Sequence, residues 1–278
     1  MKIAVVGKWW SGKTTLSWLL TNYIAQNHQV LGIDSDHNMD YIDLMWLEFD
    51  DTTPSFRKNF NNIFTYLEWQ ESERIPSKTI ANNLGYYKFS LHPQDDFSKE
   101  VLIPHTDNIH LAVVGLGWED VMSWGMCSHN ISNPLKIYLS LLDEGESEIV
   151  VDGVAGVDMI NFGLYHTCDF LCIVVEPSRN GVKVAKQIQS LCEMSQVNHW
   201  FVINKYQENT YIHDLIKAGH DKILWHIPYD EGIFNYEYDK VSKKTKASVE
   251  KIYNHCTQHK WWSLIERMMK LEQIRGRT

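Results

Sequence analysis

The sequence lacks the features of a membrane-spanning or secreted protein. None of its apolar runs approaches the roughly 18 residues that a membrane-spanning helix needs. The opening residues lead directly into a glycine-containing motif, without the longer apolar run and small-residue cleavage site of a secretion signal. Both observations lead us to expect a cytoplasmic protein.

Positive charge is also scarce, because 26 Lys and Arg residues are outnumbered by 35 Asp and Glu residues and the formal net charge is −9. A protein whose main role is to coat DNA carries a basic face, so this balance argues against that class, although it leaves room for a local basic patch. The five cysteines are odd in number and irregularly spaced, which argues against a framework of disulfides.

Short apolar runs that alternate with helical patterns predict the fold class. Most of the runs are apolar without a period of two, as expected of strands that are covered on both faces. This alternation predicts an α/β protein with a mainly parallel sheet and helices on both faces. The predicted strands are 3–6, 30–33, 109–114, 149–151, 170–175, 200–203 and 222–227, and the predicted helices include 13–27, 180–196 and 209–218.

A length of 278 residues is compatible with one domain of this class, and we expect residues 1–278 to form one. Residues 46–108 carry aromatic residues, asparagines and turn signals, and we interpret them as an insertion of helices and loops on the sheet. Residues 257–278 show apolar side chains at helical spacing beside several basic ones. We expect a last helix that packs on the sheet, and the alternative is a helix that touches a membrane.

The strongest local signal is a phosphate-binding loop. A strand with the pattern of a buried strand precedes the loop and a helical pattern follows it, as this motif requires. Consecutive backbone N–H groups in such a loop surround an anion, and the helix N-terminus adds partial positive charge. We predict that Lys13 neutralises the β- and γ-phosphates, that Thr14 is an Mg²⁺ ligand and that Thr15 reaches the α-phosphate. The segment Gly7-Lys8-Trp9-Trp10-Ser11-Gly12-Lys13-Thr14 matches the pattern G-x-x-x-x-G-K-[ST].

Acidic residues follow two predicted strands at the place where a bound nucleotide would lie. Asp34 and Asp36 follow the strand 30–33, and Asp152 ends the strand 149–151. Because the carboxyl ends of parallel strands converge on the ligand crevice, we predict that these carboxylates serve the metal ion and the attacking water. The alternative is that each acid caps a helix or a turn.

Two further residues are candidates for the base of the nucleotide. Asn204 ends the strand 200–203, and its amide can both donate and accept hydrogen bonds at the edge of adenine. Pro228 follows the next predicted strand, where it would form a wall of the same pocket. The alternative for Asn204 is an ordinary turn residue.

Together these motifs resemble the MinD, ParA and nitrogenase-iron-protein class of P-loop ATPases, whose deviant Walker A loop carries an extra lysine near its start. Lys8 stands at that position, residues 34–36 resemble the D-x-D after the second strand, and residues 152–156 resemble the Walker B segment. The resemblance covers about residues 1–235. Within the class, three later segments are most similar to the CooC-type ATPases, which insert nickel during maturation of carbon monoxide dehydrogenase: 174–178, 202–205 and 226–230.

This resemblance implies a homodimer that closes around two ATP molecules with Mg²⁺. It also assigns roles to residues at the matching positions. These are Lys8 at the partner's nucleotide, Lys13 and Thr14 at phosphate and Mg²⁺, Asp34 and Asp152 at the metal ion, Asp36 at the attacking water, and Asn204 at adenine.

The chain departs from the class at Trp9 and Trp10, where the class carries two glycines. Glycine permits a positive φ and a close approach across the dimer, whereas a Cβ at positive φ costs on the order of 1–2 kcal/mol. The two indoles would therefore displace Lys8 or hinder the closed dimer, or they would stack on a base or on each other. The sequence leaves these alternatives open.

The nickel-related ATPases carry a C-x-C pair that binds metal at the dimer interface, and the matching region here holds Cys127 and His129. Two copies of the chain would supply two thiolates and two imidazoles, a ligand set that suits Zn²⁺ or Ni²⁺. The alternative is an isolated cysteine beside a loop histidine.

Three functions are compatible with these residues. The first is an ATPase that delivers metal to a client metalloenzyme, which the acidic net charge and the pair Cys127 and His129 favour. The second is a spatial organiser like ParA or MinD that binds DNA or membrane, which the basic C-terminal segment favours. The third is a nucleotide-sensing module without hydrolysis, which Trp9 and Trp10 favour.

Overall fold

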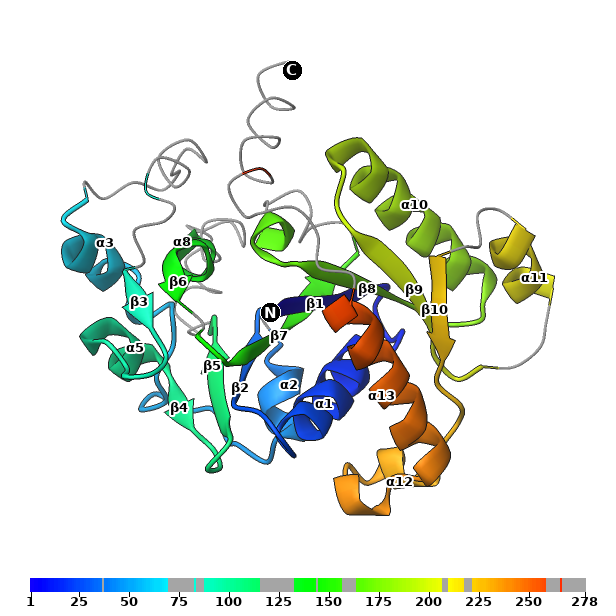
Figure 1. The fold of residues 1–278 in the computed structure, drawn as a ribbon, viewed down its shortest axis with the longest axis horizontal. Helices are drawn as coiled ribbons and strands as arrows, with labels where there is room; N and C mark the ends of the chain where they lie inside the picture. The colour runs from blue at the N-terminus through cyan, green and yellow to red at the C-terminus, as the bar shows by residue number, and fades with distance from the viewer. Residues whose placement is uncertain are drawn as a thin grey trace.

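A computed structural model shows an eight-stranded sheet with helices on both of its faces (Figure 1). It describes residues 1–36, 38–69, 83, 88–115, 133–143, 145–156, 164–206, 210–217, 222–258 and 266. Neighbouring strands of this sheet are parallel, except that β4 runs antiparallel to β5. In spatial order the strands are β10 (Ile223–His226), β9 (His199–Ile203), β8 (Phe170–Val175), β1 (Lys2–Gly7), β7 (Glu148–Ala155), β2 (Val30–Asp34), β5 (Ile109–Val113) and β4 (Ile103–Pro104).

Two hydrophobic cores, one on each face of the sheet, hold the helices in place. One core receives α1 (Lys13–Ile24), α2 (Asp40–Leu44) and α13 (Lys243–Gln258), with α12 (Glu231–Phe234) and a 3₁₀ turn, Tyr238–Lys240, packed beside them. The other core receives α3 (Asn62–Leu67), α5 (Asp96–Val101), α8 (Asn133–Leu141), α10 (Arg179–Ser195), α11 (Thr210–Lys217) and a 3₁₀ turn, Leu164–Thr167.

Strand β1 illustrates how the sequence produces these layers. Ala4 and Val6 belong to one core, whereas Ile3 and Val5 belong to the other. Because side chains alternate across a strand, a run that is apolar at every position must be covered on both faces. The prediction of a mainly parallel α/β sheet with helices on both faces is confirmed.

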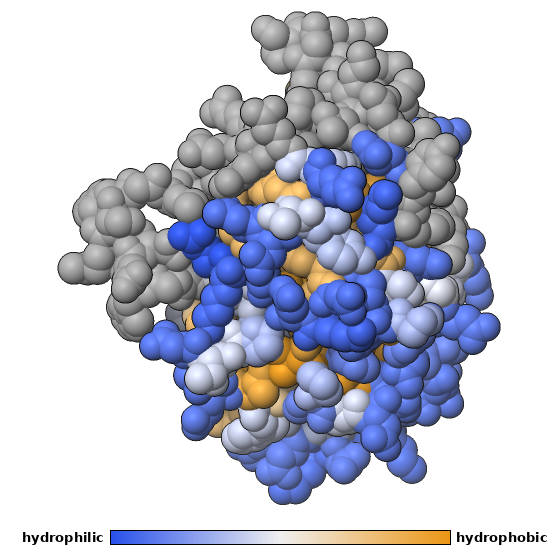
Figure 2. Space-filling model, turned by 90° about the vertical axis from the view of Figure 1, so that its left-hand side faces the viewer, coloured by the Kyte–Doolittle hydropathy of each residue, from blue (hydrophilic) through white to orange (hydrophobic). Residues whose placement is uncertain are grey.

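The described part of the segment predicted as an insertion, residues 46–69, 83 and 88–108, includes one edge of the sheet. It contains α3, α5 and β4, the edge strand, and it also contains β3 (Phe89–Ser90), which pairs with β6 (Leu142–Asp143) in a small second sheet. Figure 2 shows this side of the molecule, where hydrophilic residues predominate and hydrophobic residues are visible between them. Most of the predicted C-terminal helix, 257–278, lies outside the described residues, and its first two residues end α13.

Candidate nucleotide-binding site

The candidate phosphate loop connects the central strand β1 to helix α1. The strand ends at Gly7 and the helix begins at Lys13, so the loop lies at the carboxyl end of a strand that pairs with both β7 and β8. A Cβ at position 7 would lie 2.5 Å from the carbonyl oxygen of Val174, and Gly12 adopts a left-handed φ of 93°. Glycine is therefore needed at position 7 for close approach and at position 12 for the backbone conformation.

A carboxylate lies directly beside the start of α1. The Thr14 hydroxyl donates to Asp152 Oδ2 at 2.9 Å, and the Ser17 hydroxyl donates to Asp152 Oδ1 at 2.8 Å. Burial raises the pKa of Asp152 to about 7, although the Lys13 ammonium and both hydroxyl donors act in the opposite direction. Lys13 itself is only 7% exposed. A hydroxyl, a carboxylate and an ammonium group thus gather at one helix start, which suits Mg²⁺ together with phosphate.

Asp34 lies next to Asp152 in the sheet and organises the chain that follows β2. Its Oδ1 accepts a hydrogen bond from the Asp36 amide at 3.0 Å, and its Oδ2 accepts from the amides of Tyr41 at 2.9 Å and Ile42 at 3.3 Å. Burial, together with the neighbouring Asp152 charge, raises the pKa of Asp34 well above its usual range. Asp34 therefore supports the turn into α2, and its role at Mg²⁺ stays a prediction.

Asp36 lies in the same turn with its side chain half-buried. Its Oδ1 accepts a hydrogen bond from the Asn38 amide at 3.3 Å. Burial is the main cause of the raised pKa of Asp152, and the Asp36 charge raises this pKa further. The two carboxylates therefore lie within electrostatic reach of each other. The role of Asp36 in orienting water stays a prediction.

Asn204 supports the phosphate loop from the end of β9. Its Nδ2 donates to the Ser11 carbonyl at 2.9 Å, and its Oδ1 accepts from the Lys205 amide at 2.9 Å. A Cβ on Gly12 would lie 2.0 Å from that Nδ2 atom, so the loop and the amide are in tight contact. The predicted role of Asn204 at adenine is untested, as is that of Pro228, which lines a cavity of about 330 Å³ between β10 and α13.

The tip of the loop carries Lys8 and the two tryptophans. Lys8 Nζ lies 3.9 Å from Glu176 Oε2 of the same chain, with both side chains about one-third exposed. Trp9 is 48% exposed and Trp10 is 81% exposed, and their rings meet edge to face with centroids 6.5 Å apart. Trp10 has a φ of 65°, which is unfavourable for a bulky residue. The loop therefore presents two indoles, one of them on a strained backbone.

Sequence reasoning missed two residues of this region. Ser17 follows Thr14 by three residues on α1, so helical spacing could have placed both hydroxyls on one face. Glu176 follows β8, and only the strand order of the sheet shows that β8 is a neighbour of β1. The sequence alone does not give that order.

The second predicted metal site, Cys127 and His129, lies outside the described residues. Within the described ranges, no three His, Cys, Asp or Glu side chains are arranged to hold a metal ion. Mg²⁺ at a phosphate loop takes ligands from a hydroxyl, from the nucleotide and from water, so this finding leaves the Mg²⁺ prediction untouched. No helix in the described part of the chain is both long and apolar enough to cross a membrane.

Comparison with curated proteins finds relatives of similar length. No family model matches the chain. An uncharacterized ATP-binding protein of Methanocaldococcus jannaschii is 25% identical over 237 residues, which cover 84% of this chain and 90% of that protein. A second uncharacterized ATP-binding protein of the same organism is 23% identical over 271 residues, which cover 94% of this chain and 99% of that protein.

Solved structures share the fold over nearly the whole chain. A complex of McdA with ATP from Cyanothece has a TM-score of 0.65 at 15% identity and covers 95% of this chain and 98% of its own. A putative plasmid partition protein of Borrelia burgdorferi bound to AMPPNP has a TM-score of 0.60 at 15% identity and covers 92% of this chain and 98% of its own. MinD of Pyrococcus horikoshii with Mg-ADP has a TM-score of 0.56 at 15% identity and covers 91% of this chain and 94% of its own. The special likeness to the CooC-type ATPases stays a prediction, and the chain has the fold of the ParA and MinD class of P-loop ATPases.

Proposed function

We propose that the chain binds ATP with Mg²⁺ at Gly7–Thr15 and hydrolyses it. The observation that carries this proposal is the hydrogen bond between Thr14 and Asp152 at the start of α1, with the buried Lys13 beside it. Two curated relatives are named as ATP-binding proteins, and structural neighbours bind AMPPNP, ATP or Mg-ADP. These likenesses agree with the chemistry of the loop.

Each residue of the site has a task in this proposal. The loop amides and Lys13 bind the phosphates, and the Thr14 hydroxyl turns from Asp152 to the metal ion. The Mg²⁺ ion would neutralise charge that develops on the phosphates during transfer. Asp152 holds water in the metal shell, and Asp36 orients the attacking water.

Replacement of Lys13 tests the proposal directly. We expect Lys13→Ala to abolish ATP binding measured by calorimetry, because the ammonium group that neutralises the phosphates is lost. Lys99→Ala is the matched control, since Lys99 is an exposed lysine on α5 that pairs with Asp96. Unaltered ATP affinity in Lys13→Ala would remove the basis of the proposal. ATP binding without phosphate release would instead select the nucleotide-sensing module.

The same proposal includes a homodimer in which Lys8 reaches the partner's nucleotide. Lys8 then has to leave Glu176, and an ion pair of 3.9 Å between partly exposed groups is weak enough to break readily. Light scattering with ATP and Mg²⁺ measures the dimer. A monomer under all nucleotide conditions would contradict this part of the proposal.

For the cellular role we propose ATP-gated delivery of a metal ion to a client metalloenzyme, with Cys127 and His129 holding Zn²⁺ or Ni²⁺ at the dimer interface. The measurement is bound metal per dimer in the unaltered chain and in Cys127→Ala. Equal metal content in both proteins would contradict the metal-delivery role.

A second role is favoured by the solved neighbours, which include a plasmid partition protein and MinD. In that role the ATP-bound dimer would bind DNA or a membrane. DNA binding that weakens with salt, or liposome co-sedimentation, would support it if either required ATP. Because the net charge of −9 opposes binding to DNA, DNA binding is the less favoured of these two outcomes.

A further inference from the structure

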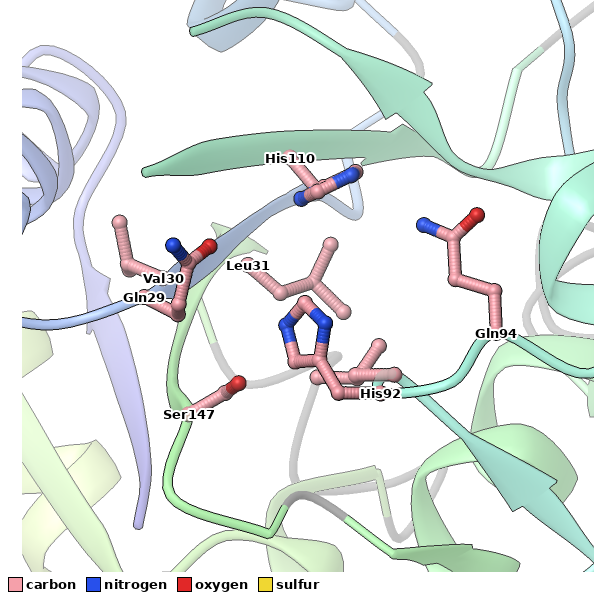
Figure 3. Close-up of a pocket in the computed structure, with 8 residues that line it drawn as sticks. Gln29, Val30, Leu31, His92, Gln94, His110 and Ser147 are labelled. Atoms are coloured by element: carbon pink, nitrogen blue, oxygen red, sulfur yellow. The ribbon is translucent and has the colours of Figure 1, made fainter. Parts of the chain in front are cut away.

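A small pocket with both polar and apolar lining residues lies at the end of the sheet opposite the phosphate loop (Figure 3). It is formed where β2, β5 and β7 begin, and a turn that follows β3 covers it. The phosphate loop follows the carboxyl end of β1, so the pocket and the loop lie at opposite ends of parallel strands. None of the roles proposed above uses this pocket.

Two histidines face each other across the pocket. His92 lies in the turn Leu91–Gln94, and His110 lies in β5. Their ring centroids are 6.1 Å apart and the ring planes are inclined at 71°. Two imidazoles that share one Zn²⁺ ion at Zn–N distances of about 2.1 Å have ring centres roughly 5–6 Å apart. The observed spacing is therefore close to that of a histidine pair bound to one metal ion.

Two oxygen atoms in the same pocket are buried without a hydrogen-bond partner among the described residues: Gln29 Oε1 and Ser147 Oγ. The Gln29 amide is fixed, because its Nε2 donates to the Asp107 carbonyl at 3.1 Å and to Asn108 Oδ1 at 2.9 Å. Figure 3 shows the Gln29 oxygen and the Ser147 hydroxyl turned toward the space beside His92. Buried polar atoms are normally satisfied, so two unpaired oxygens in one pocket indicate a missing ligand.

Water is the usual partner of such atoms, but the space between these side chains has no room for the centre of a water molecule. A metal ion differs from water because its bonds to nitrogen and oxygen are only about 2.0–2.2 Å long. Two imidazoles and two uncharged oxygens form a ligand set for a borderline transition metal such as Zn²⁺. Mg²⁺ and Ca²⁺ prefer carboxylate oxygens, which the pocket does not supply among its described lining residues.

We propose that His92 and His110, together with Gln29 Oε1 and Ser147 Oγ, bind a divalent transition-metal ion of the Zn²⁺ type. The ion ties the turn Leu91–Gln94 to the first residues of β2 and β5 and to the residue before β7. This site lies at the opposite ends of the strands from the phosphate loop, and it uses neither Cys127 nor His129, the residues predicted for the other metal site.

The test is a Zn²⁺ titration of the full chain, followed by calorimetry and by thermal unfolding. Every protein in the series carries Cys127→Ala and His129→Ala, so that the other predicted metal site cannot contribute. This background chain is expected to bind one Zn²⁺ ion at the pocket and to melt at a higher temperature when Zn²⁺ is present. Mg²⁺ at the same concentration is expected to leave the unfolding temperature of the background chain unchanged.

We expect His92→Ala and His110→Ala each to weaken Zn²⁺ binding by about tenfold or more and to remove the Zn²⁺-dependent thermal shift. His213→Ala is the matched control, because His213 is an exposed histidine on α11 that does not line the pocket, and this variant should retain both the Zn²⁺ binding and the thermal shift. His92 is exposed, so its variant should fold and decides the question even if His110→Ala does not fold. Identical Zn²⁺ binding in the background chain and in His92→Ala, or no Zn²⁺ binding by the background chain, would overturn the proposal.

Discussion

At the scale of single residues, the side-chain amide of Asn204 packs closely against Gly12 in the phosphate loop. We predict that Gly12→Ala lowers the free energy of unfolding by at least about 1–2 kcal/mol, because Gly12 has a positive φ and its new Cβ would lie 2.0 Å from Asn204 Nδ2. The same change should greatly weaken ATP binding, since the loop amides would be displaced. Urea unfolding and calorimetry with ATP measure the two effects.

The control for this prediction is a double-mutant cycle with Asn204→Ala. Removal of the amide eliminates the clash but leaves the positive φ, so Gly12→Ala should cost less in the Asn204→Ala background than in the unaltered chain. Equal costs in both backgrounds would mean that the contact between the two residues does not shape the loop.

His199 provides a pH-dependent contribution to stability. Burial is the main cause that lowers the pKa of His199, and the Lys222 ammonium lowers it further. The hydrogen bond of His199 to the Val197 carbonyl acts in the opposite direction. His199 Nε2 lies 3.1 Å from Lys222 Nζ. The unfolded chain takes up a proton near the ordinary pKa of 6.5, whereas the folded chain resists it until a lower pH. Stability contributed by neutral His199 is therefore present above pH 6.5 and is lost as the pH falls through the lowered pKa.

We predict that His199→Gln reduces the difference in unfolding free energy between pH 7.5 and pH 5.5, because glutamine does not titrate. Urea unfolding at the two pH values measures this difference. The control is His213→Gln, which changes an exposed histidine and should keep most of the pH dependence. An unchanged pH dependence in His199→Gln would assign the effect to other groups.

At the scale of elements, the N-terminus of α10 has a side-chain cap. The Ser178 hydroxyl accepts a hydrogen bond from the Gly181 amide at 3.1 Å. We predict that Ser178→Ala lowers the free energy of unfolding by about 1 kcal/mol, because this amide then loses its partner. Ser190→Ala in the same helix is the control, since Ser190 only bonds back to the Lys186 carbonyl and alanine favours a helix interior. Chemical denaturation should show a loss for Ser178→Ala and no loss for Ser190→Ala.

The elements differ in how far they could be predicted. Strands such as β1 and β8 were predicted within one residue, because a strand that is buried on both faces leaves an apolar run in the sequence. Helix α13 was missed, because it is mostly polar and buries a narrow stripe that includes Val249, Ile252 and Cys256. Strand β4 was also missed, because it is two residues long and pairs only at the sheet edge.

The candidate site shows the same division between local and long-range information. The loop and the position of Asp152 follow from a local pattern and from strand ends, and the structure brings Thr14 and Asp152 together. The hydrogen bonds of Asp34 to the start of α2 and of Asn204 to Ser11 depend on how distant segments pack. A sequence pattern identifies which polar residues end strands, but it does not say which backbone groups they contact.

At the scale of the whole molecule, the proposed homodimer would bring a second copy of the chain to a phosphate loop that carries two exposed indoles. Trp9 and Trp10 are exposed, and Trp10 has a φ of 65°, a conformation that glycine adopts without strain.

We predict that the double variant Trp9→Gly, Trp10→Gly stays folded, with its unfolding free energy changed by no more than about 1 kcal/mol. In the proposed homodimer, the double variant should form more ATP-dependent dimer and release phosphate faster, because two bulky side chains are removed from the loop and Lys8 can then reach the partner's nucleotide. Light scattering with ATP and Mg²⁺ measures the dimer, and Trp46→Ala, which removes a 77% exposed indole outside the loop, is the control. Loss of the dimer in the double variant alone would mean that the indoles form the contact between copies.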